Sequence, residues 1–209
     1  MTDAARVRLV LASASPARLA TLRAAGVEPE VVVSGVPEEG VDAGTPAGTA
    51  GELARLKAEA VAGRLGGDRL HVGPELVLGC DSVFELDGSA FGKPSGPEQA
   101  RARWRSMRGR RGTLHTGHHV IDLGSDRSVS GVASAGVTFA DVTDAEIDAY
   151  VTTGEPLLVA GGFTIDGRGG PFVERVDGDP HAVVGVSLPM LRRLLADLGV
   201  AWPRLWTGR

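Results

Sequence analysis

Residues 9–19 begin with an apolar run, Leu-Val-Leu-Ala, that passes directly into Ser-Ala-Ser-Pro-Ala-Arg-Leu. The apolar run favours a buried strand, whereas Ser15 followed by Pro16 is typical of the cap and first turn of an α-helix. The segment therefore predicts a strand, a tight turn and a helix in immediate succession. Such a turn offers hydroxyl groups and free backbone N–H groups, so it is a candidate site for an anion.

The rest of the chain alternates short apolar runs with helical patterns. We expect strands over residues 7–12, 30–34, 76–79, 83–86, 114–123, 129–140, 172–176 and 182–186. We expect helices over residues 16–25, 49–65, 96–107, 143–150 and 188–198. The loops between them include residues 37–48, a basic turn at 108–113 and a glycine-rich segment at 164–171. Thr143 and Glu146 have the spacing of a capping box at the start of the fourth helix.

This alternation predicts an α/β fold in which an elongated, mixed central sheet is flanked by helices. The sequence shows no internal repeat and no linker that would separate two autonomous parts. We therefore expect residues 1–209 to form a single domain, with residues 201–209 as a C-terminal tail.

The composition argues against several classes of protein. Apolar residues make up 43% of the 209 residues, which is enough for a core, and the formal net charge is −4. A duplex nucleic-acid binder usually shows a basic stripe, and none is visible, so we expect no nucleic acid polymer as a partner. Cys80 is the single cysteine, which excludes an intramolecular disulfide and favours an unreactive thiol. No apolar run or leader pattern points to a membrane, so we expect a cytoplasmic protein.

The turn after the first strand carries three groups that suit a phosphate. Ser13 and Ser15 offer hydroxyl groups, and Arg18 offers a guanidinium group one turn into the predicted helix. Together with the helix N-terminus they predict a phosphate cradle. The structural alternative is an ordinary strand–helix turn with a capping serine.

Asp81 follows the apolar run at residues 76–79 almost directly. An acid at the end of a strand is expected at the carboxyl edge of a sheet, where the ligand clefts of open α/β folds lie. In that position Asp81 could hold a divalent metal or activate a water molecule. The structural alternative is a solvated aspartate that hydrogen-bonds its own turn.

The sequence has two lysines, Lys57 and Lys93, among many arginines. Where the composition favours arginine, a lysine suggests that a compact point charge is required. Each could equally be a surface residue. With Asp81 and Arg18 they form a coherent set, namely cations for a polyphosphate and an acid for Mg²⁺ and water.

The remaining polar clusters carry weaker signals. His115, His118 and His119 lack the carboxylate spacing of a metal site, and we expect them at the surface or at the edge of the core. The chain contains neither a P-loop nor a Gly-x-Ser-x-Gly nucleophile elbow.

Taken in order, several segments resemble one family along residues 9–198. "LASASPARLATL" is similar to Leu-Ala-Ser-x-Ser-Pro-Arg-Arg-x-x-Leu-Leu, "SGVPEE" to Ser-Asp-Val-Asp-Glu, and "LARLKAEAV" to a Lys-Ala-x-Ala-Val helix. "VLGCDSVFELDGSAFGKPSGPEQAR" resembles Gly-Ala-Asp-Thr-Val-Val followed by Gly-Lys-Pro. "TGEPLLVAGGFTIDGRGGPFVERVDGDPHAVVGVSL" resembles the family's closing glycine-rich segments. The family is the Maf nucleoside triphosphate pyrophosphatases, also called septum formation inhibitor proteins.

The resemblance implies a metal-dependent hydrolase that cuts a nucleoside triphosphate between the α- and β-phosphates. It implies a fold like that of Maf and inosine triphosphatase, with two lobes around a central cleft, and a homodimer. The implied catalytic residues are Asp81, Lys57 and Lys93. The implied substrate-binding residues are Ser13, Ser15, Ala17, Arg18, Ser82 and Asp166. Glu38 falls on the family's loop acid and, with Asp81, is the implied ligand of Mg²⁺ or Mn²⁺.

The chain departs from the family pattern at four positions. Ala17, Ser82 and Asp166 stand where members usually carry Arg, Thr and Gln, at positions associated with the choice of nucleotide. We expect Asp166 to accept a hydrogen bond from a base edge that carries donors, such as that of guanine or a modified purine. Gly112 replaces the usual His.

These departures keep two alternatives open. One is a catalytically weak nucleotide-binding regulator of cell division, and the other is an interaction module that binds no ligand. Retention of Asp81 and both lysines favours the enzyme.

Overall fold

The computed structural model describes residues 7–66 and 75–207. Its strands are β1 (Arg8–Leu11), β2 (Glu30–Val31), β3 (Glu75–Leu86), β4 (Ser89–Phe91), β5 (Arg111–Asp122), β6 (Arg127–Phe139) and β7 (Val173–Asp177). Its α-helices are α1 (Pro16–Ala24), α2 (Pro46–Leu65), α3 (Pro97–Met107), α4 (Asp144–Thr152), α5 (Pro180–Val184) and α6 (Leu188–Asp197). Short 3₁₀ helices span Glu155–Leu158, Ala160–Gly162, Gly170–Phe172 and Trp202–Leu205.

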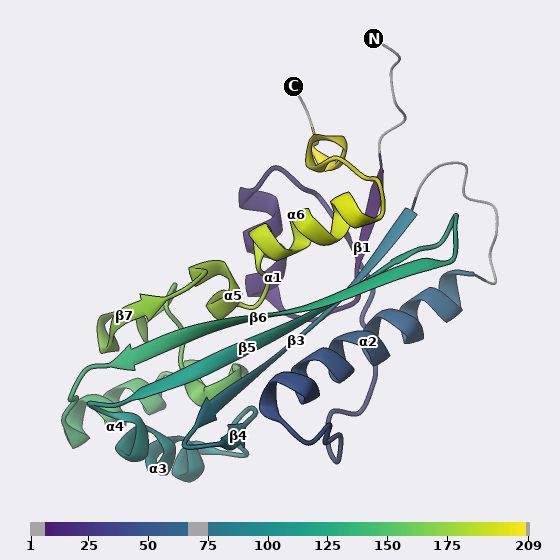
Figure 1. Ribbon diagram of the computed structural model, residues 1–209. Coiled ribbons are helices and arrows are strands. Elements are labelled where there is room, and N and C mark those ends of the chain that lie inside the picture. Colours follow the sequence, from purple (N-terminus) through teal and green to yellow (C-terminus); the bar gives the residue numbers. More distant parts are fainter. Residues whose placement is uncertain (1–6, 67–74, 208–209) are drawn as a thin grey trace.

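The strands form one mixed seven-stranded sheet, in the order β2-β1-β3-β5-β6-β7, with β4 paired to β3. The pairs β1–β2 and β1–β3 are parallel and the other pairs are antiparallel. Three long strands, β3, β5 and β6, run the length of the molecule, and helices flank them on both sides (Figure 1). The predicted α/β fold with a mixed, elongated sheet is confirmed. The division into two lobes around a cleft stays a prediction.

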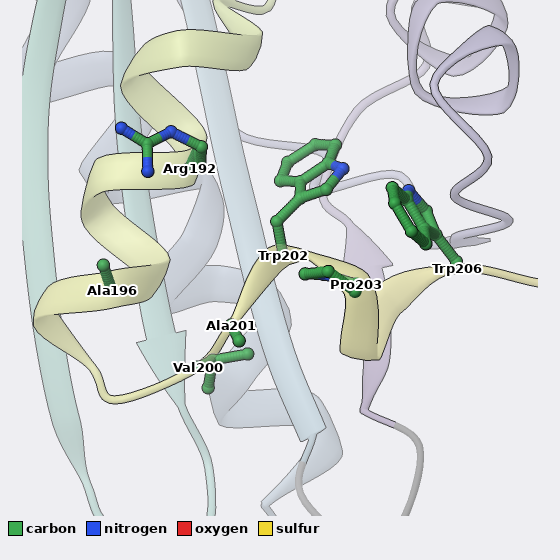
Figure 2. A pocket seen from close by; sticks show the side chains of 7 residues that line it. All are labelled: Arg192, Ala196, Val200, Ala201, Trp202, Pro203 and Trp206. Carbon is green, nitrogen blue, oxygen red and sulfur yellow. The ribbon is translucent and has the colours of Figure 1, made fainter.

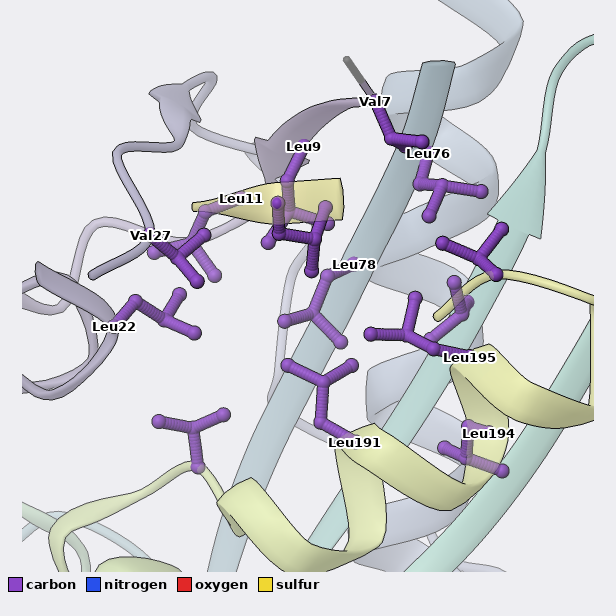
Figure 3. Packing of buried hydrophobic residues seen from close by; sticks show 14 of the residues in the cluster. Val7, Leu9, Leu11, Leu22, Val27, Leu76, Leu78, Leu191, Leu194 and Leu195 are labelled. Carbon is purple, nitrogen blue, oxygen red and sulfur yellow. The ribbon is translucent and has the colours of Figure 1, made fainter. Parts of the chain in front are cut away.

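Side chains alternate between the two faces of β3. Leu76, Leu78 and Cys80 point into a cluster with the leucines of α6, including Leu191 (Figure 3). Val77 points to the opposite face, into a cluster with residues of α2. Farther along the sheet, side chains of α3 and α4 pack against the strands in an aromatic cluster. Its members include Phe84 of β3, Trp104 of α3, Phe139 of β6 and Tyr150 of α4.

Two glycines allow α2 to lie directly on the sheet. A Cβ atom on Gly79 of β3 would lie 2.1 Å from the carbonyl oxygen of Ala54. A Cβ atom on Gly117 of β5 would lie 2.1 Å from the carbonyl oxygen of Ala50. Real Cβ atoms do not approach a backbone oxygen so closely, because the atoms would overlap. These glycines therefore fix how near α2 comes to β3 and β5.

Several expected elements have different limits in the structure. The separate strands predicted at 76–79 and 83–86 form the single strand β3, and the strand predicted at 30–34 shortens to β2. The predicted turn at 108–113 already contains the first residues of β5. The helix predicted from residue 49 begins earlier, because the Thr45 side chain caps α2 by accepting a hydrogen bond from the Gly48 N–H.

The strand predicted at residues 182–186 is wrong. This segment forms most of α5, which Asp179 caps by accepting a hydrogen bond from the His181 N–H, with Pro180 in the first turn. The short apolar run fits a strand or a helix equally well, so the cap and the proline decide. The capping box of Thr143 and Glu146 is confirmed at the start of α4.

The predicted C-terminal tail packs against the body, and its last two residues lie outside the described part. Leu205 is 2% exposed and belongs to the cluster of β1 and α6. Trp202 and Trp206 line a hollow of about 500 Å³ beside Arg192 and Ala196 of α6 (Figure 2). Across the described residues, no helix combines the length and apolar character needed to cross a membrane.

Candidate active site

Asp81 lies in the middle of β3, not at the end of a strand as the sequence suggested. β1 pairs with β3 as far as Leu78, and β4 pairs with it from Phe84. Between these points, the described residues place no strand beside residues 79–83 on that side, so the sheet edge has a notch there. β3 itself continues through Asp81, and β5 pairs with its other edge from Leu76 to Glu85. The notch depends on where the neighbouring strands stop, so the sequence of β3 did not reveal it.

The ammonium group of Lys57 joins two carboxylates across this notch. Its Nζ donates to Oδ1 of Asp81 at 2.5 Å and to Oε1 of Glu38 at 2.6 Å. The side chains of Lys57 and Asp81 are 7% and 9% exposed, whereas that of Glu38 is 46% exposed. Burial removes the charges of Lys57 and Asp81 from water, and their mutual contact must offset that free-energy cost. Glu38 extends the cluster to the surface.

Opposing effects set the pKa values of the two acids. Burial raises the pKa of Asp81 above its usual value, although the nearby charges of Lys57 and Arg18 act in the other direction. Partial burial also acts to raise the pKa of Glu38, but the hydrogen bond from Lys57 and the charges of Lys57, Lys93 and Arg18 outweigh it and lower that pKa. Asp81 is therefore the better proton acceptor of the two.

Arg18 is held by three hydrogen bonds from its guanidinium group. Nε donates to the Gly185 carbonyl oxygen at 2.8 Å, and the two terminal nitrogens donate to Oγ of Ser13 at 3.0 Å and of Ser82 at 3.1 Å. A guanidinium group has five N–H donors, so two of them have no partner among the described residues and can bind a ligand. Arg18 thus combines a fixed position with spare donors.

The opening turn has the predicted strand–turn–helix structure. Oγ of Ser15 caps α1 by accepting from the Arg18 N–H at 3.4 Å, and Oγ of Ser13 accepts from the Ser15 N–H at 3.2 Å. Ala17, half-buried, follows in the first turn of α1. The use of this turn as a phosphate cradle stays a prediction.

Thr116 is a member of the site that the sequence analysis missed. Its hydroxyl group donates to the Ala182 carbonyl oxygen at 2.7 Å and lies 2.9 Å from Oγ of Ser82. Because a hydroxyl has one proton, Thr116 must accept from Ser82, which in turn accepts from Arg18. The available signal was a polar run, His115 to His119, inside a long central strand.

Lys93 lies in the turn between β4 and α3 and is exposed. Its charge lowers the pKa of Glu38, as do the charges of Lys57 and Arg18. Hydrogen bonds thus join Arg18 to Ser13 and Ser82, and Lys57 to Glu38 and Asp81, and the charges of Arg18 and Lys93 act on Glu38.

Within the described residues, no hydrogen bond or ion pair joins Asp166 to this group. It is exposed and lines a separate hollow with Thr21, His181, Leu188 and neighbouring residues of α1 and α5. None of the side chains around Lys57 lines that hollow. A contact between Asp166 and a base therefore stays a prediction.

Gly112 is buried, and a Cβ atom there would lie 2.2 Å from the ring of Phe84. In this chain Phe84 occupies the space that a larger residue at position 112 would need.

The expectation that the three histidines lie at the surface or the core edge is wrong for His118, which is 0% exposed, while His115 and His119 are also buried. Nδ1 of His115 lies 2.8 Å from Oγ of Ser134, and Nδ1 of His119 lies 2.6 Å from Oγ of Ser130. Across residues 7–66 and 75–207, no group of three or more His, Cys, Asp or Glu side chains could hold a metal ion. A serine hydroxyl thus contacts one ring nitrogen of His115 and one of His119, and Oε2 of Glu85 contacts the other ring nitrogen of His115.

Cys80 is buried, and burial raises the pKa of its thiol to about 12. A thiol with so high a pKa is a poor nucleophile. This agrees with the expectation that Cys80 is unreactive.

Asp81 and Glu38 nevertheless suit a magnesium ion bound together with a substrate. Among the described residues, the hydrogen bonds to these acids use Oδ1 of Asp81 and Oε1 of Glu38. Each carboxylate therefore retains a second oxygen. Mg²⁺ is commonly held by one or two carboxylates together with substrate phosphates and waters, which is what this donor set can offer.

Known proteins resemble this chain along most of its length. Residues 8–198 match the family described as Maf-like protein. A nucleoside triphosphate pyrophosphatase of Streptomyces coelicolor is 58% identical over 206 residues, covering 99% of this chain and 98% of that protein. One from Streptomyces avermitilis is 56% identical over 209 residues, covering 100% and 99%. The solved structure of the Staphylococcus aureus Ham1 protein is similar with a TM-score of 0.43 and 17% identity, over 64% of this chain and 72% of that one.

Proposed function

Because the chain belongs to the Maf family and is a nucleoside triphosphate pyrophosphatase, we propose that it hydrolyses the bond between the α- and β-phosphates. The products are a nucleoside monophosphate and pyrophosphate. The observation that carries this proposal is the ammonium group of Lys57, bound to Asp81 and Glu38 beside Arg18 and Lys93.

In the proposed reaction, a water oxygen attacks the α-phosphorus while the bond from that phosphorus to the bridging oxygen breaks. Asp81 takes the proton of the water. Its two oxygens offer about four lone-pair sites and Lys57 uses one, so sites remain for both the proton and a metal ion. A raised pKa makes Asp81 a stronger base than an ordinary aspartate. Lys57 holds the carboxylate in place during the attack.

The leaving pyrophosphate gains negative charge as the bond breaks, so fixed cations must face it. Arg18 supplies its two uncommitted N–H donors from a rigid position. Lys93 supplies a second cation, whose charge already acts on Glu38. We propose that Asp81 and Glu38 bind Mg²⁺ or Mn²⁺, which supplies further neutralisation of the phosphates.

The proposal extends to substrate choice, location and assembly. Ser13 and Ser15 bind phosphate, and Ala17, Ser82 and Asp166 influence the choice of base. An unchanged ranking of nucleotides in Asp166→Gln would remove Asp166 from this set. We place the enzyme in the cytoplasm, where nucleoside triphosphates are used, and propose a homodimer on the family resemblance. Light scattering at working concentration tests the dimer.

Product analysis tests the reaction. Purified protein is incubated with a panel of standard and modified nucleoside triphosphates, with Mg²⁺, Mn²⁺ or a chelator. We expect a monophosphate and pyrophosphate, and we expect neither from Asp81→Asn or with the chelator. Asp148→Asn, which removes an exposed acid of α4, is the matched control and should retain activity.

Two results would contradict the proposal. Release of a single phosphate would mean that a different bond is cleaved. Tight nucleotide binding without turnover in folded protein would favour the regulator of cell division instead.

A further inference from the structure

The turn that carries Lys93 is held by one arginine of α3. The guanidinium group of Arg103 donates to the Gly92 carbonyl oxygen at 2.6 Å and to Oε1 of Gln99 at 2.9 Å. The same Gln99 oxygen accepts from the Ser95 N–H at 2.8 Å. Arg103 therefore binds the backbone of Gly92, which precedes Lys93, directly. It is linked through Gln99 to the backbone of Ser95, which follows the turn.

Two further contacts fix this arrangement. The guanidinium carbon of Arg103 lies 5.3 Å from the ring centroid of Phe91, in a cation–π contact. The Gly92 carbonyl oxygen also accepts from the Gly161 N–H at 3.1 Å, so both of its lone pairs are used. The turn is thereby tied to α3 and to the segment that follows α4.

Arg103 differs from the arginines on either side of it in α3. Arg101 pairs with Glu98 and Asp148, and Arg105 pairs with Asp144. Within the described part of the chain, no carboxylate pairs with Arg103, and its partners are neutral. Burial lowers the pKa of Arg103, so a partly desolvated cation is kept here without a counter-charge. A surface role does not account for that cost, whereas holding the turn does.

We propose that Arg103 is a positioning residue, which sets the backbone of the Gly92–Pro94 turn so that Lys93 meets the phosphates of the substrate. This inference rests on the proposed function of Lys93. Lysine has a long, flexible stem, so its charge reaches a fixed place only if the stem starts from a fixed place. Small displacements of such a group reduce the rate strongly.

Lysine in place of Arg103 keeps the charge but cannot bind two acceptors in one plane. We expect Arg103→Lys to lower kcat/KM about tenfold. The matched control is Arg105→Lys, at an exposed position two residues farther along the same helix, and it should leave kcat/KM unchanged. Because Arg103 acts through Lys93, we expect Arg103→Lys to cause less than about a twofold further loss in the Lys93→Ala background.

Kinetics of the four combinations decide the inference. Full multiplication of the two losses in the double variant would overturn the positioning role. Full activity of Lys93→Ala would overturn the proposed role of Lys93, and the inference with it, whatever Arg103→Lys does. If Arg103→Lys does not fold, Gln99→Met removes the shared acceptor, and its loss should likewise vanish in the Lys93→Ala background.

Discussion

The contact between Lys57 and Asp81 predicts a specific loss of stability. Lys57→Met keeps most of the stem but removes the charge, and leaves a carboxylate that is 9% exposed without its partner. Removing one partner of a buried pair costs about 3–5 kcal/mol. Because Asp81 can take up a proton and so lose its unpaired charge, we expect a loss at the lower end of this range, about 3 kcal/mol. For a chain of this length that corresponds to a fall in Tm of about 6–12 °C. The Glu38 side chain is 46% exposed, so water can solvate its carboxylate once Lys57 is gone, and it adds little to the loss of stability.

The loss should depend on pH in a defined direction. Burial already raises the pKa of folded Asp81, and removal of Lys57 raises it further. Below about pH 4, Asp81 is protonated both folded and unfolded, so the two proteins should differ least there. As pH rises, the unfolded chain releases the proton first, the folded parent next and the folded variant last, so the variant loses stability over a wider pH range than the parent. The difference in stability stops growing once pH exceeds the pKa of Asp81 in the folded variant.

Urea unfolding followed by tryptophan fluorescence between pH 4 and pH 8 measures this difference. The double variant Lys57→Met/Asp81→Asn is the decisive control, because it removes the stranded charge and should recover most of the lost stability. Equal stability of Lys57→Met and the parent at pH 7 would refute the reasoning. Failure of the double variant to recover stability would do the same, since the loss would then come from packing.

Three other substitutions probe the supports of the site. Gly79→Ala should force α2 away from β3, because its Cβ would lie 2.1 Å from the Ala54 carbonyl oxygen; we expect a loss of about 1–3 kcal/mol in thermal unfolding together with lower activity. Gly112→His should destabilise the protein by a similar amount, about 1–3 kcal/mol, because its Cβ would lie 2.2 Å from the ring of Phe84 and 2.7 Å from the Glu85 carbonyl oxygen; a fully stable Gly112→His would contradict this. Thr116→Val should cost about 1–3 kcal/mol by leaving a buried carbonyl of α5 unpaired, and wild-type stability and kcat/KM would show that the bond is dispensable.

Local signals in the sequence predicted the opening turn well. Ser15 and Pro16 identify the start of α1, and Thr143 with Glu146 identifies the start of α4, because a cap involves residues close together in the chain. The short run at 182–186 lacked such unambiguous periodicity. A segment of five residues fits a strand or a single helical turn, and only Asp179 and Pro180 separate the two.

The site was predictable in its membership more than in its geometry. Resemblance placed Glu38, Lys57 and Asp81 together, but spacing alone could not, since their contacts join residues 19 and 24 positions apart. The position of Asp81 within β3 depends on where β1 and β4 stop pairing, which is a property of the sheet. Thr116 was missed because its partners lie on β3 and α5, far from it in the chain.

The first and last segments that the structure describes lie side by side. The Val7 N–H donates to the Arg204 carbonyl oxygen at 3.2 Å, and Leu205 completes the cluster around β1. During synthesis the first strand therefore emerges long before the residues that cover it. β1 also cannot pair with β3 until β3 has been synthesised, since that pairing begins at Glu75. The nascent protein must keep this apolar strand from aggregating until almost the whole chain has left the ribosome, so truncation near Ala201 should harm folding yield more than a loss of a few surface residues would suggest.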